Sequence, residues 1–163
     1  MAMIKKTPVT PDKALMRLEA LCARSEHSCG ELRQKLRLWG VSACDEEKII
    51  ASLQQRKFVD DERFARAYVR DKLRFSHWGR VKIRVGLIAK RVSSPIIAIA
   101  ISEEISVEEY ESTLVSVLRT KMRAIEDADS YDGRTRLFRF GVSRGFEPGE
   151  VSRVLRSKEL WES

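Results

Sequence analysis

Apolar residues recur every three or four positions along nearly the whole chain, which is the spacing of amphipathic α-helices. The pattern begins after Asp12, where Leu15, Leu18 and Leu21 mark one helix face, and it continues to about Ser157. No segment alternates apolar and polar residues over the length of a strand, and no hairpin signal is present. The sequence therefore predicts an all-α fold.

Capping residues divide this pattern into separate helices. Ser28 followed by Glu31 matches a capping box at the start of a helix, and Gly40 is suited to end it. Asp60 is expected to cap a later helix, because its carboxylate can accept backbone N–H bonds at the positive end of the helix dipole. Pro95 suits a first turn. Further helices are expected at about 80–91, 134–144 and 148–157.

The predicted helices repeat in groups of three. Gly30, Gly79 and Gly133 each open the middle helix of a group, at spacings of 49 and 54 residues. A shift of 54 residues aligns apolar positions of the second and third groups: Ile83 with Leu137, Ile88 with Val142, Val92 with Phe146, Ile97 with Val151 and Ile101 with Leu155. The first group has a shorter middle helix, so that Val41 takes the place of Val92.

Periods of this length are typical of arrays of helical units, whereas the alternative is chance matching between amphipathic helices. We expect an elongated array of three tandem three-helix repeats. Its expected parts are a flexible N-terminal tail at 1–11, repeats at 12–59, 60–105 and 106–158, and a C-terminal tail at 159–163.

Basic residues outnumber acidic ones by 31 to 24, which gives a net charge of +7 and favours a polyanionic partner or an acidic protein surface. The excess is concentrated between Arg63 and Arg91, where ten Lys and Arg residues stand against Asp71 alone. The acids gather instead between Glu103 and Glu111.

The middle helix of each repeat is basic, and we take its charges as the candidate binding site. Arg80 and Arg84 lie four residues apart on one helix face, where they repel each other unless a partner neutralises them. The alternative is a solvated face whose aliphatic stems cover apolar neighbours. We expect Arg80, Lys82 and Arg84 to face the solvent. The candidate contacts are Arg80, Lys82, Arg84, Lys90 and Arg91, with Arg33 and Arg136 as secondary contacts.

Signatures of catalysis are missing. The chain has no phosphate-binding loop and no dinucleotide-binding glycine pattern. Its three cysteines have no metal-ligand spacing and are expected to be reduced thiols. Asp60, Asp61 and Glu62 are explained better by a helix start than by a metal site. We therefore expect a non-enzymatic protein without metal or cofactor.

The chain shows no apolar run long enough for a membrane span and no apolar core of a secretory signal at its start. We expect a cytoplasmic protein.

One stretch resembles a known family. Residues 58–69, FVDDERFARAYV, are similar to the central signature of RecX regulatory proteins, and residues 28–40 resemble the first repeat of that family. The second repeat adds further matches at Gly79, Arg80, Arg84, Leu87, Lys90, Arg91 and Val92. The resemblance covers roughly residues 12–157. One departure is Arg91, where the family pattern usually has glycine.

The resemblance implies three tandem three-helix units and a role in regulating the RecA recombinase. Proteins of this family bind the RecA filament on single-stranded DNA along its groove. They hinder its growth and suppress ATP hydrolysis, strand exchange and co-protease action, which modulates recombination, DNA repair and the SOS response. The implied partners are the RecA filament and single-stranded DNA, with weak binding to duplex DNA. We expect a monomer.

Two other functions stay open at the level of the sequence. The first is a sequence-nonspecific or helix-turn-helix DNA-binding protein that acts without RecA. The middle helix of the second repeat offers only Arg and Lys, which suit phosphates better than base edges. The second is an interaction scaffold that binds no nucleic acid. Trp78 could stack on a base, although packing between two helices is the favoured interpretation.

Overall fold

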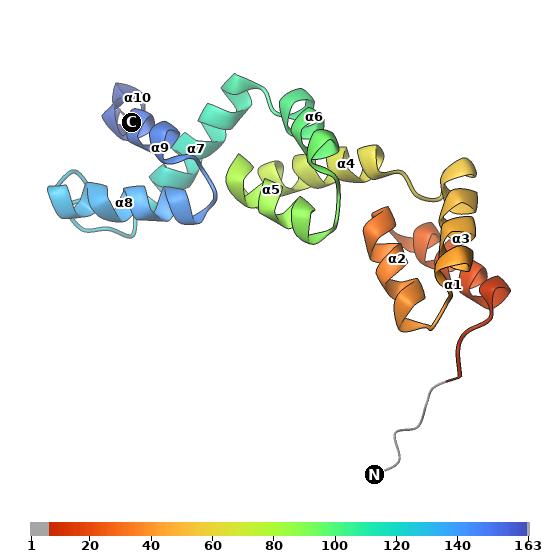
Figure 1. Ribbon diagram of the computed structural model, residues 1–163. Coiled ribbons are helices and arrows are strands. Elements are labelled where there is room, and N and C mark those ends of the chain that lie inside the picture. The colour runs from red at the N-terminus through yellow and green to blue at the C-terminus, as the bar shows by residue number, and fades with distance from the viewer. Residues whose placement is uncertain (1–6, 163) are drawn as a thin grey trace, which may run out of the picture.

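The computed structural model describes residues 7–162, and within them it contains only helices and their connections (Figure 1). The predicted all-α fold is confirmed. The helices are α1 (Pro11–Arg24), α2 (Cys29–Leu38), α3 (Ala43–Gln55), α4 (Asp61–Arg74), α5 (Arg80–Ala89), α6 (Ser94–Glu104), α7 (Val107–Met122), α8 (Tyr131–Ser143), α9 (Pro148–Arg156) and α10 (Lys158–Trp161). None of them is both long and apolar enough to cross a membrane.

The helices fall into three units that lie in a row, as Figure 1 shows. We refer to α1–α3 as unit 1, to α4–α6 as unit 2, and to α7–α9 with the short α10 as unit 3. In each unit the middle helix packs against a neighbouring helix of the same unit, as α2 does on α3, α5 on α4 and α8 on α9. The expected helical array is therefore present.

Side-chain caps begin the helices. Ser28 accepts the N–H of Glu31 at 3.1 Å while Glu31 accepts the N–H of Ser28 at 3.1 Å, so the predicted capping box is confirmed. Asp60 caps α4 as expected. The start expected for α8 is wrong by three residues, because Ser130 caps the helix and Tyr131 is its first residue.

Buried apolar side chains form two cores in the described part of the chain. Unit 1 has its own core, built around Leu18, Leu36 and Leu53. Units 2 and 3 share a second, continuous core that includes Ile83 and Leu137, the first pair matched by the repeat shift. Because burial of apolar surface is the main favourable term in folding, units 2 and 3 are joined more strongly to each other than to unit 1.

The N-terminal tail is shorter than expected. Pro11 already belongs to α1, and the N–H of Val9 donates to the carbonyl of Trp39 at 2.9 Å. Val9 also packs against the core of unit 1. Residues 1–6 of the expected tail lie outside the described residues.

The expected C-terminal tail is wrong for most of its length. Residues 158–161 form α10, and Leu160 is buried in the shared core. The indole of Trp161 donates to the carbonyl of Leu155 at 3.0 Å. A helix of one turn is too short to show a periodic pattern, and its burial depends on contact with α7, which is distant in sequence.

A residue with left-handed backbone ends the middle helix of each unit. The φ angles are +75° at Gly40, +59° at Arg91 and +92° at Gly145. Arg91 and Gly145 are also matched by the shift of 54 residues. Arg91 therefore adopts the conformation that glycine takes in the other two units, although a side chain makes that conformation less favourable by about 1–2 kcal/mol.

Gly79 brings the start of α5 against the end of α8. Its N–H donates to the carbonyl of Arg144 at 2.8 Å, and the N–H of Val81 donates to the carbonyl of Gly145 at 3.0 Å. A Cβ atom on Gly79 would lie 2.3 Å from the carbonyl carbon of Gly145, which is closer than non-bonded atoms allow. Only glycine fits this close approach of two backbones.

We predict that Gly79→Ala lowers the free energy of unfolding by about 1–3 kcal/mol, the usual cost of forcing extra atoms into a packed site. The matched control is Gly149→Ala, because a Cβ there meets nothing within 4 Å. Alanine at this exposed helical position should be neutral or stabilise by up to about 1 kcal/mol. Chemical denaturation followed by circular dichroism measures both variants, and equal stability of the two would contradict the close approach.

Candidate partner-binding surface

Arg80 belongs to the junction between units 2 and 3. Its guanidinium carbon lies 3.8 Å from the ring centroid of Tyr110, and its Nη1 lies 3.5 Å from a carboxylate oxygen of Glu147. The backbone N–H of Arg80 donates to the Tyr110 hydroxyl at 3.0 Å, and that hydroxyl donates to Glu147 at 2.5 Å. Burial raises the pKa of the Tyr110 phenol. The expectation that Arg80 faces the solvent is wrong, because its charge is used inside the fold.

Lys82 is also engaged within the chain. Its Nζ lies 4.6 Å from the ring centroid of Trp78, and the Nζ of Lys72 lies 4.6 Å from the same centroid. Trp78 is partly buried against the shared core. The indole of Trp78 thus contacts two ammonium groups and the core, which agrees with the interpretation that Trp78 packs between helices. The expectation that Lys82 faces the solvent is wrong, because its ammonium group lies against this ring.

The large local charge excess of unit 2 is neutralised in part by folding. Acids at the end of α6 and in the first turn of α7 lie against α4 in the structure. Arg66 and Arg70 both pair with Glu104, at 3.2 and 3.1 Å, and Arg74 pairs with Glu109 at 2.7 Å. These acids are distant from the basic stretch in sequence, but in the fold they lie beside it.

Two candidate cations within the middle helices remain exposed. Arg84 on α5 and Arg136 on α8 make no ion pair or hydrogen bond with any side chain or backbone group among residues 7–162. The expected solvent exposure of Arg84 is confirmed, while a contact of either residue with a partner stays a prediction.

Lys90 joins units 1 and 2. Its Nζ pairs with Glu31 at 2.7 Å, and its carbonyl accepts the hydroxyl of Ser28 at 2.5 Å. The hydrogen bond with Glu31 raises the pKa of Lys90. Nearby, the N–H of Cys29 donates to the Asp61 carboxylate at 2.7 Å. The junction between units 1 and 2 is therefore held by polar and charged groups.

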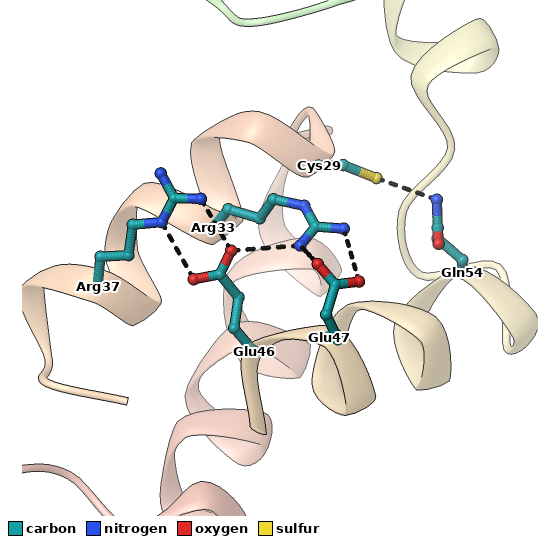
Figure 2. A network of polar contacts seen from close by, with 6 residues as sticks. All are labelled: Cys29, Arg33, Arg37, Glu46, Glu47 and Gln54. Atoms are coloured by element: carbon teal, nitrogen blue, oxygen red, sulfur yellow. Dashed lines mark hydrogen bonds and ion pairs between the residues drawn. The ribbon is translucent and has the colours of Figure 1, made fainter. Parts of the chain in front are cut away.

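Arg33 is part of an ion-pair network between α2 and α3 (Figure 2). Glu46, only 5% exposed, receives Arg33 at 3.2 Å and two bonds from Arg37 at 3.1 Å each. Arg33 also donates to Glu47 at 2.6 Å, and this bond raises the pKa of Arg33. The two guanidinium groups thus face two carboxylates, Glu46 and Glu47, so the charges within this cluster balance.

A cleft of about 340 Å³ lies between units 1 and 2. Three arginines line it, Arg33 and Arg37 from α2 and Arg91 from the end of α5, together with one carboxylate, that of Asp61, which accepts the N–H of Cys29. Arg91 is exposed and makes no ion pair within the described chain. The structure thus brings together two candidate residues from different units. Arg37 was missed, although its position one turn after Arg33 is a signal that could have found it.

This architecture defines an all-α repeat protein with an arginine-lined cleft at a junction between units. The comparisons with known proteins agree with the all-α repeat fold. The family model for the second three-helix domain of RecX matches residues 60–101. The RecX regulatory protein of Pelodictyon phaeoclathratiforme is 30% identical over 148 residues, which cover 90% of this chain and 88% of that protein. The chain therefore belongs to the RecX family of regulatory proteins.

Other relatives differ in length, and solved structures share the fold. The RecX protein of Clostridium perfringens strain 13 is 32% identical over 128 residues, which cover 77% of this chain but only 59% of that protein. The crystal structure of RecX from Lactobacillus salivarius superposes with a TM-score of 0.81 at 19% identity, over 90% of this chain and 94% of that one.

We predict that Glu46→Gln destabilises the chain at neutral pH and not in acid. Hydrogen bonds from Arg37 and Arg33 lower the pKa of Glu46 below its ordinary value. A carboxylate with a lowered folded-state pKa stabilises the fold above its unfolded-state pKa, and this contribution is lost as the pH falls through the folded-state value. The variant should lose about 1.5–3 kcal/mol at pH 7, the range for hydrogen bonds to charged groups.

Denaturation at pH 7 and at about pH 3 measures this difference. Glu47→Gln is the control, because the side chain of Glu47 is 70% exposed and its ion pair contributes little. A Glu46→Gln deficit that is the same at both pH values would contradict the assignment.

Proposed function

We propose that this RecX-family chain binds the RecA filament on single-stranded DNA and inhibits the activities of RecA. The inhibited activities are ATP hydrolysis, strand exchange and co-protease action, and through them the chain modulates recombination and DNA repair. The observation that carries the proposal is membership of the family, at 30% identity over 90% of the chain.

The shape of the chain supports this proposal. A row of three units presents a long surface, and a filament is a repetitive partner along which such a surface can contact more than one subunit. Because the N–H groups at the start of α5 are bonded to unit 3, unit 2 is held in a defined place relative to unit 3. A single chain should therefore act on several recombinase subunits.

The cleft between units 1 and 2 supports a contact with DNA phosphates. Arg33, Arg37 and Arg91 line it, and guanidinium groups form strong, often bidentate bonds to phosphate oxygens. Glu46 and Glu47 hold Arg33 in place, whereas Arg91 makes no ion pair among the described residues. Such contacts are independent of base sequence, which is what binding to a filament on any single strand requires.

We predict that the wild-type chain inhibits the DNA-dependent ATPase of its cognate RecA at well below one molecule per recombinase subunit. Titration of the chain into an ATPase assay measures this ratio. Inhibition that needs one chain or more per subunit, or no inhibition, would contradict the proposal. Sequence-specific binding to one duplex, without an effect on RecA, would favour the DNA-binding alternative.

For the cleft, we predict that Arg91→Glu weakens binding to single-stranded DNA and flattens its salt dependence. Loss of one phosphate contact should reduce the slope of log affinity against log salt by about 0.7, the value per contact on single strands. Fluorescence anisotropy of a labelled oligonucleotide between about 50 and 200 mM salt gives the slope.

Lys13→Glu on α1 is the matched control for this prediction. Lys13 is exposed, makes no ion pair within the described chain and does not line the cleft, but its reversal changes the net charge by the same amount. Equal effects of the two reversals would show that only total charge matters and would remove the cleft as the phosphate site.

A further inference from the structure

Three aliphatic side chains form an exposed stripe on the outer face of α5. Val81, Val85 and Ile88 are 43%, 61% and 54% exposed. Their spacing of four and then three residues places them on one face of the helix. We refer to these three residues as the α5 stripe. Arg84 is exposed at the edge of the stripe.

The fold does not require this stripe. When the ends of the middle helices are aligned, Gly40 with Arg91 and Gly145, the position of Val85 carries Gln34 in unit 1 and Arg139 in unit 3, and both of these residues are exposed. The position of Ile88 carries Arg37 in unit 1 and Val142 in unit 3, so neither of the other units repeats the whole stripe. Valine and isoleucine also favour the helix less than residues such as Lys, Arg or Gln do. Neither packing nor helix formation explains the stripe.

The other exposed apolar residues of the chain do not form such a surface. Among the described residues these are Met16, Leu38, Phe75, Ile99, Val107, Tyr131 and Val142, which lie on separate helices or at helix ends. Apolar residues scattered singly over a surface are ordinary, whereas a contiguous apolar surface bordered by polar groups marks an interaction site.

The chemistry of the stripe selects a protein partner over a nucleic acid. Phosphates would be desolvated against aliphatic groups without gaining a hydrogen bond, and aliphatic side chains offer no ring on which a base can stack. The α5 helix contains no carboxylate, and its unpaired Arg84, three residues after Val81 and four before Ile88, lies at the edge of the stripe. The complementary surface is therefore apolar with carboxylates at its edge.

We propose that the α5 stripe is the docking surface for the protein subunits of the filament, on an apolar patch bordered by acidic residues, while DNA phosphates bind elsewhere, at the arginine-lined cleft. The inference rests on the proposed function and deepens it, because it assigns the protein contact and the nucleic-acid contact to different surfaces. Arg84 then pairs with a carboxylate of the subunit, and its charge favours the encounter with an acidic partner.

The test is the triple variant Val81→Ser, Val85→Ser and Ile88→Ser. Serine forms helices about as readily as valine and isoleucine, and all three positions are exposed, so the variant should fold like the wild type. The control variant carries Met16→Ser, Leu38→Ser and Val107→Ser, which removes three apolar side chains outside the stripe that are more exposed than those of the stripe, at 68%, 79% and 66%.

Two affinities are measured for each protein by biolayer interferometry. One is for filaments assembled by the cognate RecA on an immobilised oligonucleotide with a non-hydrolysable ATP analogue, and the other is for the same oligonucleotide alone. The stripe variant should bind the filament roughly tenfold more weakly or worse, because three buried apolar contacts are lost. It should bind naked DNA within about twofold of the wild type, since phosphate contacts are unchanged. The control should match the wild type in both.

The outcomes separate this inference from the proposed function. A wild-type chain that does not bind the filament overturns both. A wild-type chain that binds, together with a stripe variant that binds equally well, overturns only the docking assignment. Proportional loss of naked-DNA affinity in the stripe variant would make the stripe a nucleic-acid contact. A wild-type dimer in sedimentation that the stripe variant dissociates would assign the stripe to a second copy of the chain. Either result overturns the proposal.

Discussion

N–H groups at the start of the middle helices of units 1 and 2 find acceptors in the following unit. Helix α5 has no side-chain cap of its own, and its first N–H groups donate to the backbone that ends α8 and to the Tyr110 hydroxyl. In α2 the capping box does not use the N–H of Cys29, and this group donates to the carboxylate of Asp61 in unit 2. A buried N–H without a partner costs about 1–3 kcal/mol, so units 1 and 2 each depend on the unit that follows. The row of units, the cleft and the outward direction of the α5 stripe all follow from this arrangement.

At both junctions a backbone N–H of one unit donates to an acceptor in the next unit, but the side chains around these bonds differ. Between units 2 and 3 the close approach at Gly79 continues into a shared apolar core, and Tyr110 and Phe146 pack with ring centroids 5.2 Å apart. Between units 1 and 2 the contacts are hydrogen bonds and the pair of Lys90 with Glu31. Partly exposed charge pairs weaken as salt increases, whereas apolar burial does not. The cleft lies at the polar junction, where units 1 and 2 have separate cores.

Local signals in the sequence predicted the local structure. Periodicity and caps such as Ser28 gave the helices, and the repeat shift correctly paired Ile83 with Leu137 in the core. The same shift paired Ile88 with Val142, yet both are exposed, because periodicity identifies an apolar position without showing whether anything covers it. The prediction of free cationic residues from the charge pattern was wrong at several positions for a similar reason. Glu104 lies 34 residues from Arg70 in sequence but pairs with it in space, and Arg80 is occupied by a ring and a carboxylate from unit 3. These contacts depend on tertiary packing.

The central claim is that the exposed face of α5 meets protein while the cleft meets DNA, and site-specific photo-crosslinking tests it most directly. A benzophenone amino acid replaces Val85 in one protein and Leu38 in another, since both side chains are well exposed, at 61% and 79%. Each protein is irradiated on the RecA filament, and the products are identified by mass spectrometry. The account predicts crosslinks from position 85 to the recombinase subunit, with few or none from position 38. Crosslinks from position 85 to DNA, or to a second copy of the chain, would contradict it.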